Sequence, residues 1–419
     1  MSPRARSANR GATAGLPAER AQTPVGDLLV RRAGRVVTNA GPPLDGPATV
    51  AVRGGVVAWV GPDEKVPWSV TDAPELDAAG ACVIPGFVDP HTHALWAGSR
   101  REEFVARLEG ARYDGGGIAS TVAATADATD DELVDLAAGR LRAMAANGTT
   151  TVEVKTGYGL EPEPELRLLR LVGRLADRVP LRVEPTLLAH VVPSGVDRAE
   201  HVRELVTVLP EAARLGARWV DVFCDRGAYT PQEARVLLRA GAAAGLGGRL
   251  HAEQLARTGA AELAAECRCA SADHLEHVDA AGARAMAAAG VVGVLLPTAT
   301  LTTRGPWDSA RVLREAGVTL ALGTDCNPGT SWCESVPYAL QLAGALLGLG
   351  VGEAVRAATA GGAAALRRDD LGVLRVGAAG DLLVLAAGHE ADLLAHLGAP
   401  AVTTTVVGGV PVAGRRTLR

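Results

Sequence analysis

Residues 83–100 read VIPGFVDPHTHALWAGSR, and they join a short apolar run to two histidines placed one residue apart. The run at 83–88 predicts a buried β-strand. Because side chains alternate along an extended chain, His91 and His93 are expected to lie on the same side of the segment that follows this strand. Two imidazoles aimed at one point are typical of a metal site.

Seven further runs of strand length follow, at 149–155, 181–188, 218–224, 247–253, 269–276, 291–298 and 318–325. Helical patterns separate these runs. One helix is expected to end at Asn147-Gly148, and another is expected to begin at Thr230 and Pro231, a favourable N-cap and first helical residue. Eight strands, each followed by a helix or a long loop, predict an α/β fold of the (β/α)8 TIM-barrel type.

The two ends of the chain have a different texture, with short β-type runs divided by glycine and proline turns. We therefore expect a small β-sandwich domain built from both termini, with its first part at residues 26–82 and its second at 367–419. The barrel is expected at 83–366. Residues 1–25 are rich in arginine, alanine and glycine without periodicity, and are expected to be a disordered tail.

The composition argues against nucleic acids and membranes as partners. A net charge of −5 over 419 residues gives no electrostatic case for nucleic acid or an anionic membrane. Residues 1–23 carry no apolar signal-peptide core, and no apolar run approaches the length of a membrane span. The six cysteines follow no disulfide framework, which favours free thiols in a reducing compartment. The expectation is a soluble, cytoplasmic protein that acts on a small molecule.

Polar residues gather where the predicted barrel strands end, which is where barrel enzymes place their sites. Five of the 9 histidines and one aspartate occupy these positions: His91, His93, His190, His251, His274 and Asp325. A single buried histidine is usually an ordinary core residue. Five of them at strand ends, together with an aspartate, are much harder to explain as packing.

Three neutral imidazoles and one carboxylate suit a catalytic Zn²⁺ or iron ion. We expect the ligands to be the pair His91 and His93, with His251 and Asp325 reaching in from the opposite wall. His190 and His274 are then left to face the substrate. The expected cofactor is one Zn²⁺ or Fe³⁺ per subunit, because these ligand types do not distinguish the two metals.

The arrangement resembles the amidohydrolase superfamily, which joins the same barrel to a β-sandwich built from both termini. In that superfamily, members with two metals usually bridge them with a carboxylated lysine at the end of strand four. Here strand four ends in VDVFCD, without a lysine, and Lys155 ends strand two. The resemblance therefore implies a mononuclear site.

Several segments also resemble the imidazolonepropionases, in the same order along nearly the whole chain: HTHALWAGSRREEFVARLEG, GGGIASTVAAT, TTTVEVKTGYGL, LLAHVVP, DVFCD, HAEQL, ADHLEH, LLPTAT and TDCNPGT. This family hydrolyses the cyclic amide C–N bond of 4-imidazolone-5-propanoate to give N-formimidoyl-L-glutamate, in histidine degradation. The resemblance also implies a homodimer.

The residue types suit such a substrate, which is a small polar ring with a carboxylate tail. Arg100 can bind a carboxylate with two parallel hydrogen bonds, and the resemblance makes it the arginine for the propionate tail. By the same resemblance, substrate contacts are expected from Tyr158, His190, Gln254, Asn327, Gly329 and Thr330. The expected catalytic residues are Asp325, which carries the proton, His274, which stabilises the developing oxyanion, and Gln254.

Three loops depart from the family pattern. The connection at 113–115 is short, and the loops at 299–305 and 331–335 have unusual residues. Two alternatives therefore stay open. One is another mononuclear amidohydrolase, a deaminase or cyclic-amide hydrolase, acting on a related anionic heterocycle. The other is a catalytically silent metal-binding scaffold, against which the intact His251, His274 and Asp325 argue.

Overall fold

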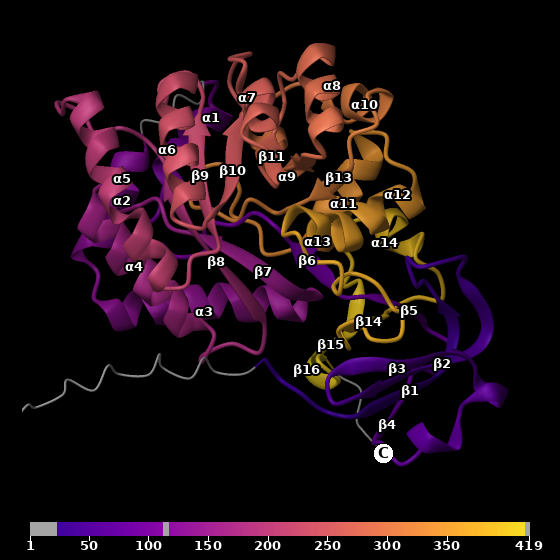
Figure 1. Ribbon diagram of the computed structural model, residues 1–419. Helices are drawn as coiled ribbons and strands as arrows, with labels where there is room; N and C mark the ends of the chain where they lie inside the picture. Colours follow the sequence, from indigo (N-terminus) through magenta and orange to yellow (C-terminus); the bar gives the residue numbers. More distant parts are fainter. Residues whose placement is uncertain (1–22, 112–116, 415–419) are drawn as a thin grey trace, which may run out of the picture.

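The computed structural model describes residues 23–111 and 117–414 (Figure 1). Most of the expected N-terminal tail and the short connection at 113–115 lie outside the described residues. Among the described residues, no helix is both long and apolar enough to span a membrane. All six cysteines are free thiols, as expected.

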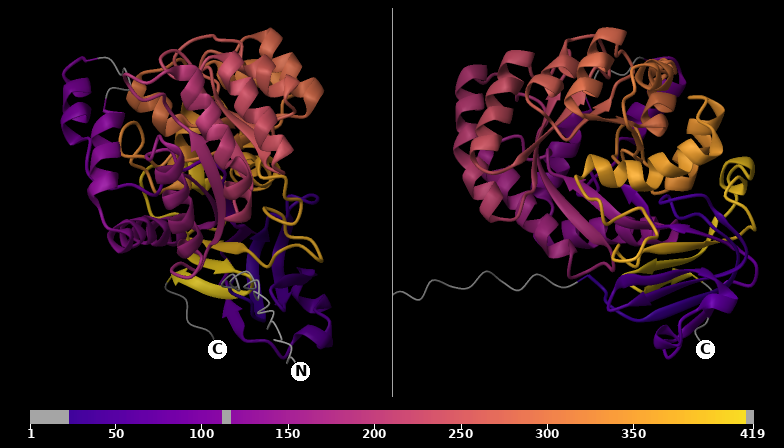
Figure 2. Two further views of the ribbon diagram at one scale, coloured as in Figure 1. Left: turned by 60° about the vertical axis from the view of Figure 1, so that its left-hand side comes forward. Right: turned by 45° about the vertical axis from the view of Figure 1, so that its right-hand side comes forward.

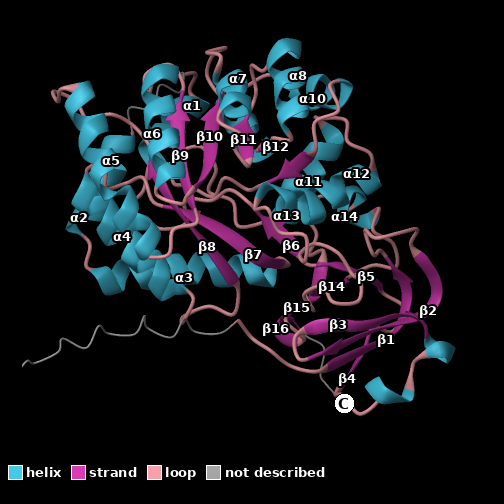
Figure 3. Cartoon of the chain, viewed as in Figure 1, coloured by secondary structure: helices cyan, strands magenta, loops and turns pink. Residues whose placement is uncertain are grey.

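Eight parallel strands form the barrel in chain order, which confirms the predicted fold (Figure 3). They are β6 (Phe87–Asp89), β7 (Thr149–Lys155), β8 (Arg182–Ala189), β9 (Trp219–Cys224), β10 (Gly247–Ala252), β11 (Ser271–His274), β12 (Val292–Leu295) and β13 (Leu320–Leu322). Each agrees with a predicted run to within a few residues, except the first.

Helices surround the barrel strands (Figures 1 and 3). Those before the fourth barrel strand are α1 (Arg101–Leu108), α2 (Ile118–Asp127), α3 (Asp130–Ala146), α4 (Pro162–Leu175) and α5 (Arg198–Arg214). The later ones are α6 (Pro231–Ala243), α7 (Ala260–Glu266), α8 (Ala280–Ala289), α9 (Pro297–Thr303), α10 (Ser309–Glu315), α11 (Val336–Ala345), α12 (Val351–Arg356), the π-helical turn Ala357–Gly361 and α13 (Gly362–Ala365). Outside the barrel lie α14 (Asp392–Ala395) and two 3-10 turns, Asp63–Lys65 and Trp68–Val70.

Local sequence signals set where these helices begin. The Thr230 side chain accepts a hydrogen bond from the backbone N–H of Glu233, and the Glu233 carboxylate accepts one from the backbone N–H of Thr230. Pro231 is the first residue of α6. The same capping box, between Thr129 and Glu132, begins α3. Such boxes satisfy backbone N–H groups that the first helical turn leaves unpaired.

The barrel closes between its first and last strands, just beyond their ends. A parallel bridge joins Thr92 to Cys326, the backbone N–H of His93 donates to the Cys326 carbonyl at 2.9 Å, and that of Asp325 donates to the His91 carbonyl at 3.0 Å. The Asp89 carboxylate also accepts from the Thr324 backbone N–H and hydroxyl, at 3.1 and 2.6 Å. The seam of the barrel therefore passes through the segments that carry the predicted metal ligands.

Strands from both termini form a second, mixed sheet beside the barrel (Figure 2). They are β1 (Leu28–Val36), β2 (Leu44–Arg53), β3 (Val56–Pro62), β4 (Glu75–Asp77), β5 (Cys82–Pro85), β14 (Leu382–Leu385), β15 (Val402–Val407) and β16 (Val410–Gly414). The two parts meet where β14 pairs antiparallel with β5. A buried cluster of aliphatic side chains from both parts, including Val83, Leu382 and Val406, forms the core of this domain.

The run at 83–88, predicted as one barrel strand, is two strands. Residues up to Pro85 belong to β5 of the terminal sheet, and only Phe87–Asp89 enter the barrel. Gly86 lies between the two strands. A larger residue would not fit there, because a Cβ atom would lie 2.3 Å from the Thr150 hydroxyl oxygen. Its backbone N–H also donates to the Asp381 carbonyl at 3.0 Å. A continuous apolar run therefore conceals a change of sheet.

Candidate metal centre and active site

A cavity with about 340 Å³ of empty space lies where the barrel strands end. Its walls contain most of the predicted site residues, together with Ile118 and Phe223: His93, Arg100, Tyr158, His190, His251, Gln254, His274, Asp325, Asn327 and Thr330. Two other predicted residues lie against this set. His91 is fully buried beside Asp325, and Gly329 packs on Arg100.

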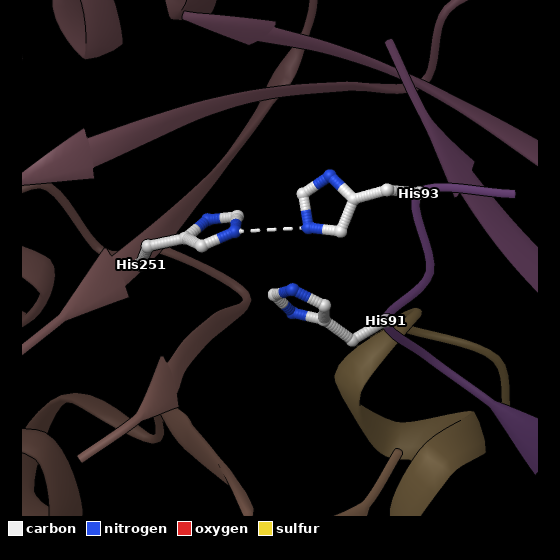
Figure 4. Close-up of side chains that lie close together, drawn as sticks. All are labelled: His91, His93 and His251. Carbon is white, nitrogen blue, oxygen red and sulfur yellow. Dashed lines mark hydrogen bonds between the residues drawn. The ribbon is translucent and has the colours of Figure 1, made fainter. Parts of the chain in front are cut away.

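Four nitrogen and oxygen atoms converge at the inner end of this cavity. Nε2 of His91 and Nε2 of His93 lie 3.5 and 3.4 Å from the same carboxylate oxygen of Asp325. Nε2 of His251 lies 3.4 Å from Nε2 of His93. Figure 4 shows His251 reaching toward the other two imidazoles from the opposite side. The structure therefore brings together the four ligands that the sequence predicts.

The donor atoms fit a metal ion. The three histidines place one nitrogen each within 4.8 Å of one another, as do His91, His274 and Asp325 with one atom each. Nε2 of His91 is buried and has no hydrogen-bond partner among the described residues, which is costly unless a ligand occupies that position. The site could thus hold a metal ion, and its imidazole and carboxylate donors suit Zn²⁺ and iron alike.

Burial favours the neutral form of the three clustered histidines. It lowers the pKa of His93 to about 3 and that of His251 to about 4, and it lowers the pKa of His91 well below its usual value. The positive charge of Lys155 acts in the same direction on His91 and His93. A neutral imidazole offers a lone pair, which is the form that binds a metal.

Two buried aspartates orient the ligand imidazoles from behind. Asp273 lies 2.6 Å from Nδ1 of His91, and Asp221 lies 3.1 Å from Nδ1 of His251. An imidazole that donates Nδ1–H to a carboxylate presents the lone pair of Nε2 to the metal. Our sequence analysis missed both aspartates. The available signal was a carboxylate in an otherwise apolar barrel strand, as in SADH and WVDVFC.

Lys155, at the end of β7, is fully buried and points at carboxylates. Its ammonium donates to Glu153 and Asp221, both at 2.7 Å. Burial opposes a charged ammonium, but the charges of Asp221 and Glu153 outweigh this effect and raise the pKa of Lys155. The lysine therefore acts as a hydrogen-bond donor to the carboxylates behind the histidine cluster.

His190 has a defined tautomer. Its Nδ1 lies 2.9 Å from the Gly157 carbonyl oxygen, so Nδ1 carries the hydrogen. Burial lowers the pKa of His190 to about 3, which keeps the ring neutral. The ring stacks on His93 with centroids 5.6 Å apart, and Tyr158 packs edge-on against it. His190 thus has Nε2 left as a hydrogen-bond acceptor.

His274 differs from the other site histidines in the direction of its pKa shift. Burial alone would lower its pKa, but the carboxylate of Glu276, 3.7 Å from Nδ1, and the charges of Asp325 and Asp273 outweigh burial and raise the pKa of His274. Burial likewise raises the pKa of Asp325. A histidine that favours the cationic form next to a carboxylate can donate a hydrogen bond to a developing negative charge.

Arg100 is buried, and its side chain is held by a partner that our sequence analysis missed. Nε and Nη2 donate to the two carboxylate oxygens of Glu103 at 2.7 and 2.9 Å. Gly329 lies against the guanidinium, since a Cβ atom there would be 2.2 Å from Nη1. The two-nitrogen edge expected to bind a substrate carboxylate is thus paired with Glu103. The signal was the spacing of Arg100 and Glu103, one helical turn apart.

The loop after Asp325 is shaped by Asn327. Its side-chain oxygen accepts from the backbone of Gly329 and Thr330 at 2.8 and 2.7 Å, and its nitrogen donates to the Asp325 carbonyl and the Thr330 hydroxyl at 2.7 and 2.9 Å. These four bonds use the whole capacity of the amide. Asn327 therefore holds the loop in place, and its direct contact with substrate stays a prediction. Gln254 lines the cavity at a partly exposed position.

Comparisons with known proteins show the family of the chain. A family model described as the amidohydrolase family matches residues 109–413. Imidazolonepropionases from Salinispora arenicola and Myxococcus xanthus are 47% and 45% identical to the chain, over 92% and 91% of its length and 98% and 96% of theirs.

Solved structures show the same fold at low identity. A triazine hydrolase variant has a TM-score of 0.75 and 17% identity, over 93% of this chain and 95% of its own. The ochratoxinase of A. niger has a TM-score of 0.71 and 20% identity, over 93% and 96%. With the curated relatives covered almost end to end, the chain belongs to the amidohydrolase family and, within it, to the imidazolonepropionases.

Proposed function

We propose that this protein hydrolyses the cyclic amide C–N bond of 4-imidazolone-5-propanoate to N-formimidoyl-L-glutamate, a step of histidine degradation. One observation carries the proposal: a buried set of converging metal ligands and a buried arginine line the same cavity. The ligand set accounts for hydrolysis, and the arginine accounts for an anionic substrate. The high identity to imidazolonepropionases supports the same conclusion.

The cavity suggests how the substrate binds. Arg100 receives the propionate carboxylate, either beside Glu103 or in its place, and Tyr158 lies on the same wall. His190 accepts a hydrogen bond from a ring N–H through Nε2, because its Nδ1–H is committed to Gly157. Gln254, as a neutral donor and acceptor, completes the ring contacts. The ring carbonyl is then directed toward Asp325 and His274.

We propose that His91, His93, His251 and Asp325 hold one Zn²⁺ or Fe³⁺ ion. Such an ion would polarise the substrate carbonyl and would lower the pKa of water, which would supply a nucleophile at neutral pH. The neutral state of the three imidazoles and the orientation of two of them by Asp221 and Asp273 support this assignment.

The residues of the chain handle the protons. Asp325 accepts a proton from the attacking water, and His274 donates a hydrogen bond to the carbonyl oxygen as it becomes negative. The C–N bond of the ring then breaks, and Asp325 delivers the proton to the departing nitrogen. One water is consumed: its oxygen enters the new carboxylate, and both of its hydrogens end on the nitrogens of the amidinium group, so the step balances without release of a proton.

The test uses purified, metal-replete protein and freshly generated 4-imidazolone-5-propanoate, with loss of the ring chromophore followed beside an Asp325→Asn control. Metal-dependent loss with N-formimidoyl-L-glutamate as product is expected. If folded, metal-bound protein causes no loss of the chromophore above the spontaneous rate, 4-imidazolone-5-propanoate is not its substrate. The related anionic heterocycles expected as alternatives would then be tested in the same assay.

A further inference from the structure

Five charged side chains lie behind the metal ligands, and all five are fully buried: Glu153, Lys155, Asp221, Arg249 and Asp273. They come from β7 and from the three consecutive strands β9, β10 and β11, with β8 between β7 and β9. We refer to them as the buried charge cluster. Burying so many charges is expensive unless each is paired, so their arrangement calls for a function.

Lys155 lies at the centre of this cluster. Its Nζ is 2.7 Å from Glu153, 2.7 Å from Asp221 and 3.8 Å from Asp273. Glu153 also accepts a hydrogen bond from the Thr186 hydroxyl. One ammonium group therefore contacts three carboxylates, on its own strand and on two others.

Two of these carboxylates are the ones that orient metal ligands. Asp221 accepts from Nδ1 of His251, and Asp273 accepts from Nδ1 of His91. Asp221 meets the His251 imidazole with Oδ1 and the lysine ammonium with Oδ2. At Asp273 the His91 imidazole and the more distant lysine ammonium both lie near Oδ2. A shift of either carboxylate would turn the attached imidazole and move its Nε2.

We propose that Lys155 is a positioning residue that holds both Asp221 and Asp273 and, through them, aims Nε2 of His251 and His91 at the metal. The inference rests on the metal site proposed above. Lys155 itself lies one layer away from the ligand atoms, so its effect is on the geometry and affinity of the metal site.

Arg249 has a more limited part in the cluster. Its Nη2 donates to Asp273 at 3.1 Å and to the Pro90 carbonyl at 2.7 Å, and its Nη1 donates to the Ala365 carbonyl at 2.8 Å. Without Lys155, this single arginine would face three buried carboxylates. Asp221 would lose the cation that lies 2.7 Å from it and would no longer be fixed against His251.

The test replaces Lys155 with methionine, which keeps the unbranched shape and removes the charge. Zn²⁺ affinity is measured by competition with a chromogenic chelator, and stability of the metal-free protein by urea denaturation. The visible spectrum of Co²⁺-loaded protein reports the ligand geometry independently of turnover. Arg182→Met is the matched control, because it removes a partly buried cation that pairs with Asp381 and contacts no metal ligand in the described structure.

Loss of a group that orients metal ligands typically weakens metal affinity by about 10- to 100-fold. We expect at least a tenfold weaker Zn²⁺ affinity and an altered Co²⁺ spectrum in Lys155→Met, with unchanged affinity in Arg182→Met. A change below tenfold in folded Lys155→Met would overturn the inference, whatever the loss of stability.

A second variant covers the case in which Lys155→Met does not fold. The double variant Lys155→Met/Glu153→Gln removes one positive and one negative charge, so the net charge of the cluster is kept, and the same tenfold criterion applies to it. Failure of the wild-type protein to bind one Zn²⁺ would refute the proposed metal site instead. The two failures are therefore distinguishable.

Discussion

The contact between Gly329 and Arg100 makes a quantitative prediction about substrate binding. A Cβ atom at position 329 would lie 2.2 Å from Nη1 and 2.5 Å from Cζ of Arg100, whereas ordinary contact begins at 3.4 Å. In Gly329→Ala the guanidinium must therefore move by about 1.2 Å, the difference between 3.4 and 2.2 Å. Arg100 is buried and makes two hydrogen bonds to Glu103. Moving its guanidinium would therefore strain or break these hydrogen bonds.

A misplacement of about 1 Å in a group that positions substrate can reduce the rate about 100-fold. We expect kcat/KM of Gly329→Ala for 4-imidazolone-5-propanoate to fall by about 10- to 100-fold, which corresponds to about 1.4 to 2.8 kcal/mol. Most of the fall should appear in KM, because a carboxylate contact distant from the reacting bond stabilises ground state and transition state alike.

The assay is steady-state kinetics on metal-replete protein, with Gly139→Ala as the control. A Cβ atom at Gly139, on α3, meets nothing within 4 Å, so this variant should keep wild-type kinetics. If folded Gly329→Ala has a kcat/KM within threefold of wild type, Arg100 does not determine how the anionic tail binds.

Three further predictions concern the metal site and the fold. Asp325→Asn should keep the far-UV circular dichroism spectrum yet lower kcat by about 10³-fold or more, because an amide cannot accept and deliver the proton. Near-normal turnover would contradict the role of Asp325 in proton transfer. Removal of the metal with a chelator should abolish activity and lower Tm, and added Zn²⁺ should restore both. The effect on Tm is expected because a ligand at about 100 times its Kd stabilises the folded state by about 2.7 kcal/mol. A Tm that does not respond to metal would contradict the proposed metal site. His201 is buried against the Tyr229 hydroxyl at 2.8 Å, and burial lowers its pKa from the usual 6.5. The unfolded chain then binds more protons at this residue, so the free energy of unfolding should fall as the pH decreases through about 6.5, and urea denaturation of His201→Gln should show a shallower fall.

Much of the barrel could be predicted from the sequence because its strands are buried on both sides and read as continuous apolar runs. The same property concealed the break at Gly86, where Val83 and Phe87 are equally apolar but belong to different sheets. Hydrophobic patterns record burial, and they do not record which sheet a strand joins. That information depends on pairing with β14, about 300 residues further along the chain.

The candidate site also contains residues that the sequence predicted and residues that it did not. The histidines and Asp325 were predictable because each directly follows or ends a strand, and a parallel barrel brings such positions together. The pairing of Arg100 with Glu103, the use of Asn327 as a scaffold for its own loop and the supports Asp221 and Asp273 were not predicted. Each depends on side-chain directions and on partners from other strands, which spacing along the sequence does not encode.

The position of the barrel seam has a consequence for how this protein is made. The ribosome releases His91 well before Asp325, and at about 5 to 20 residues per second the interval between them is about 10 to 50 s. During that time the first strand has no neighbour across the seam, because Thr92 pairs with Cys326. His91 and His93 of the proposed metal site emerge early, but Asp325 arrives only after the eighth strand. The proposed ligand set is therefore complete only at a late stage of synthesis, when the two sides of the seam can meet.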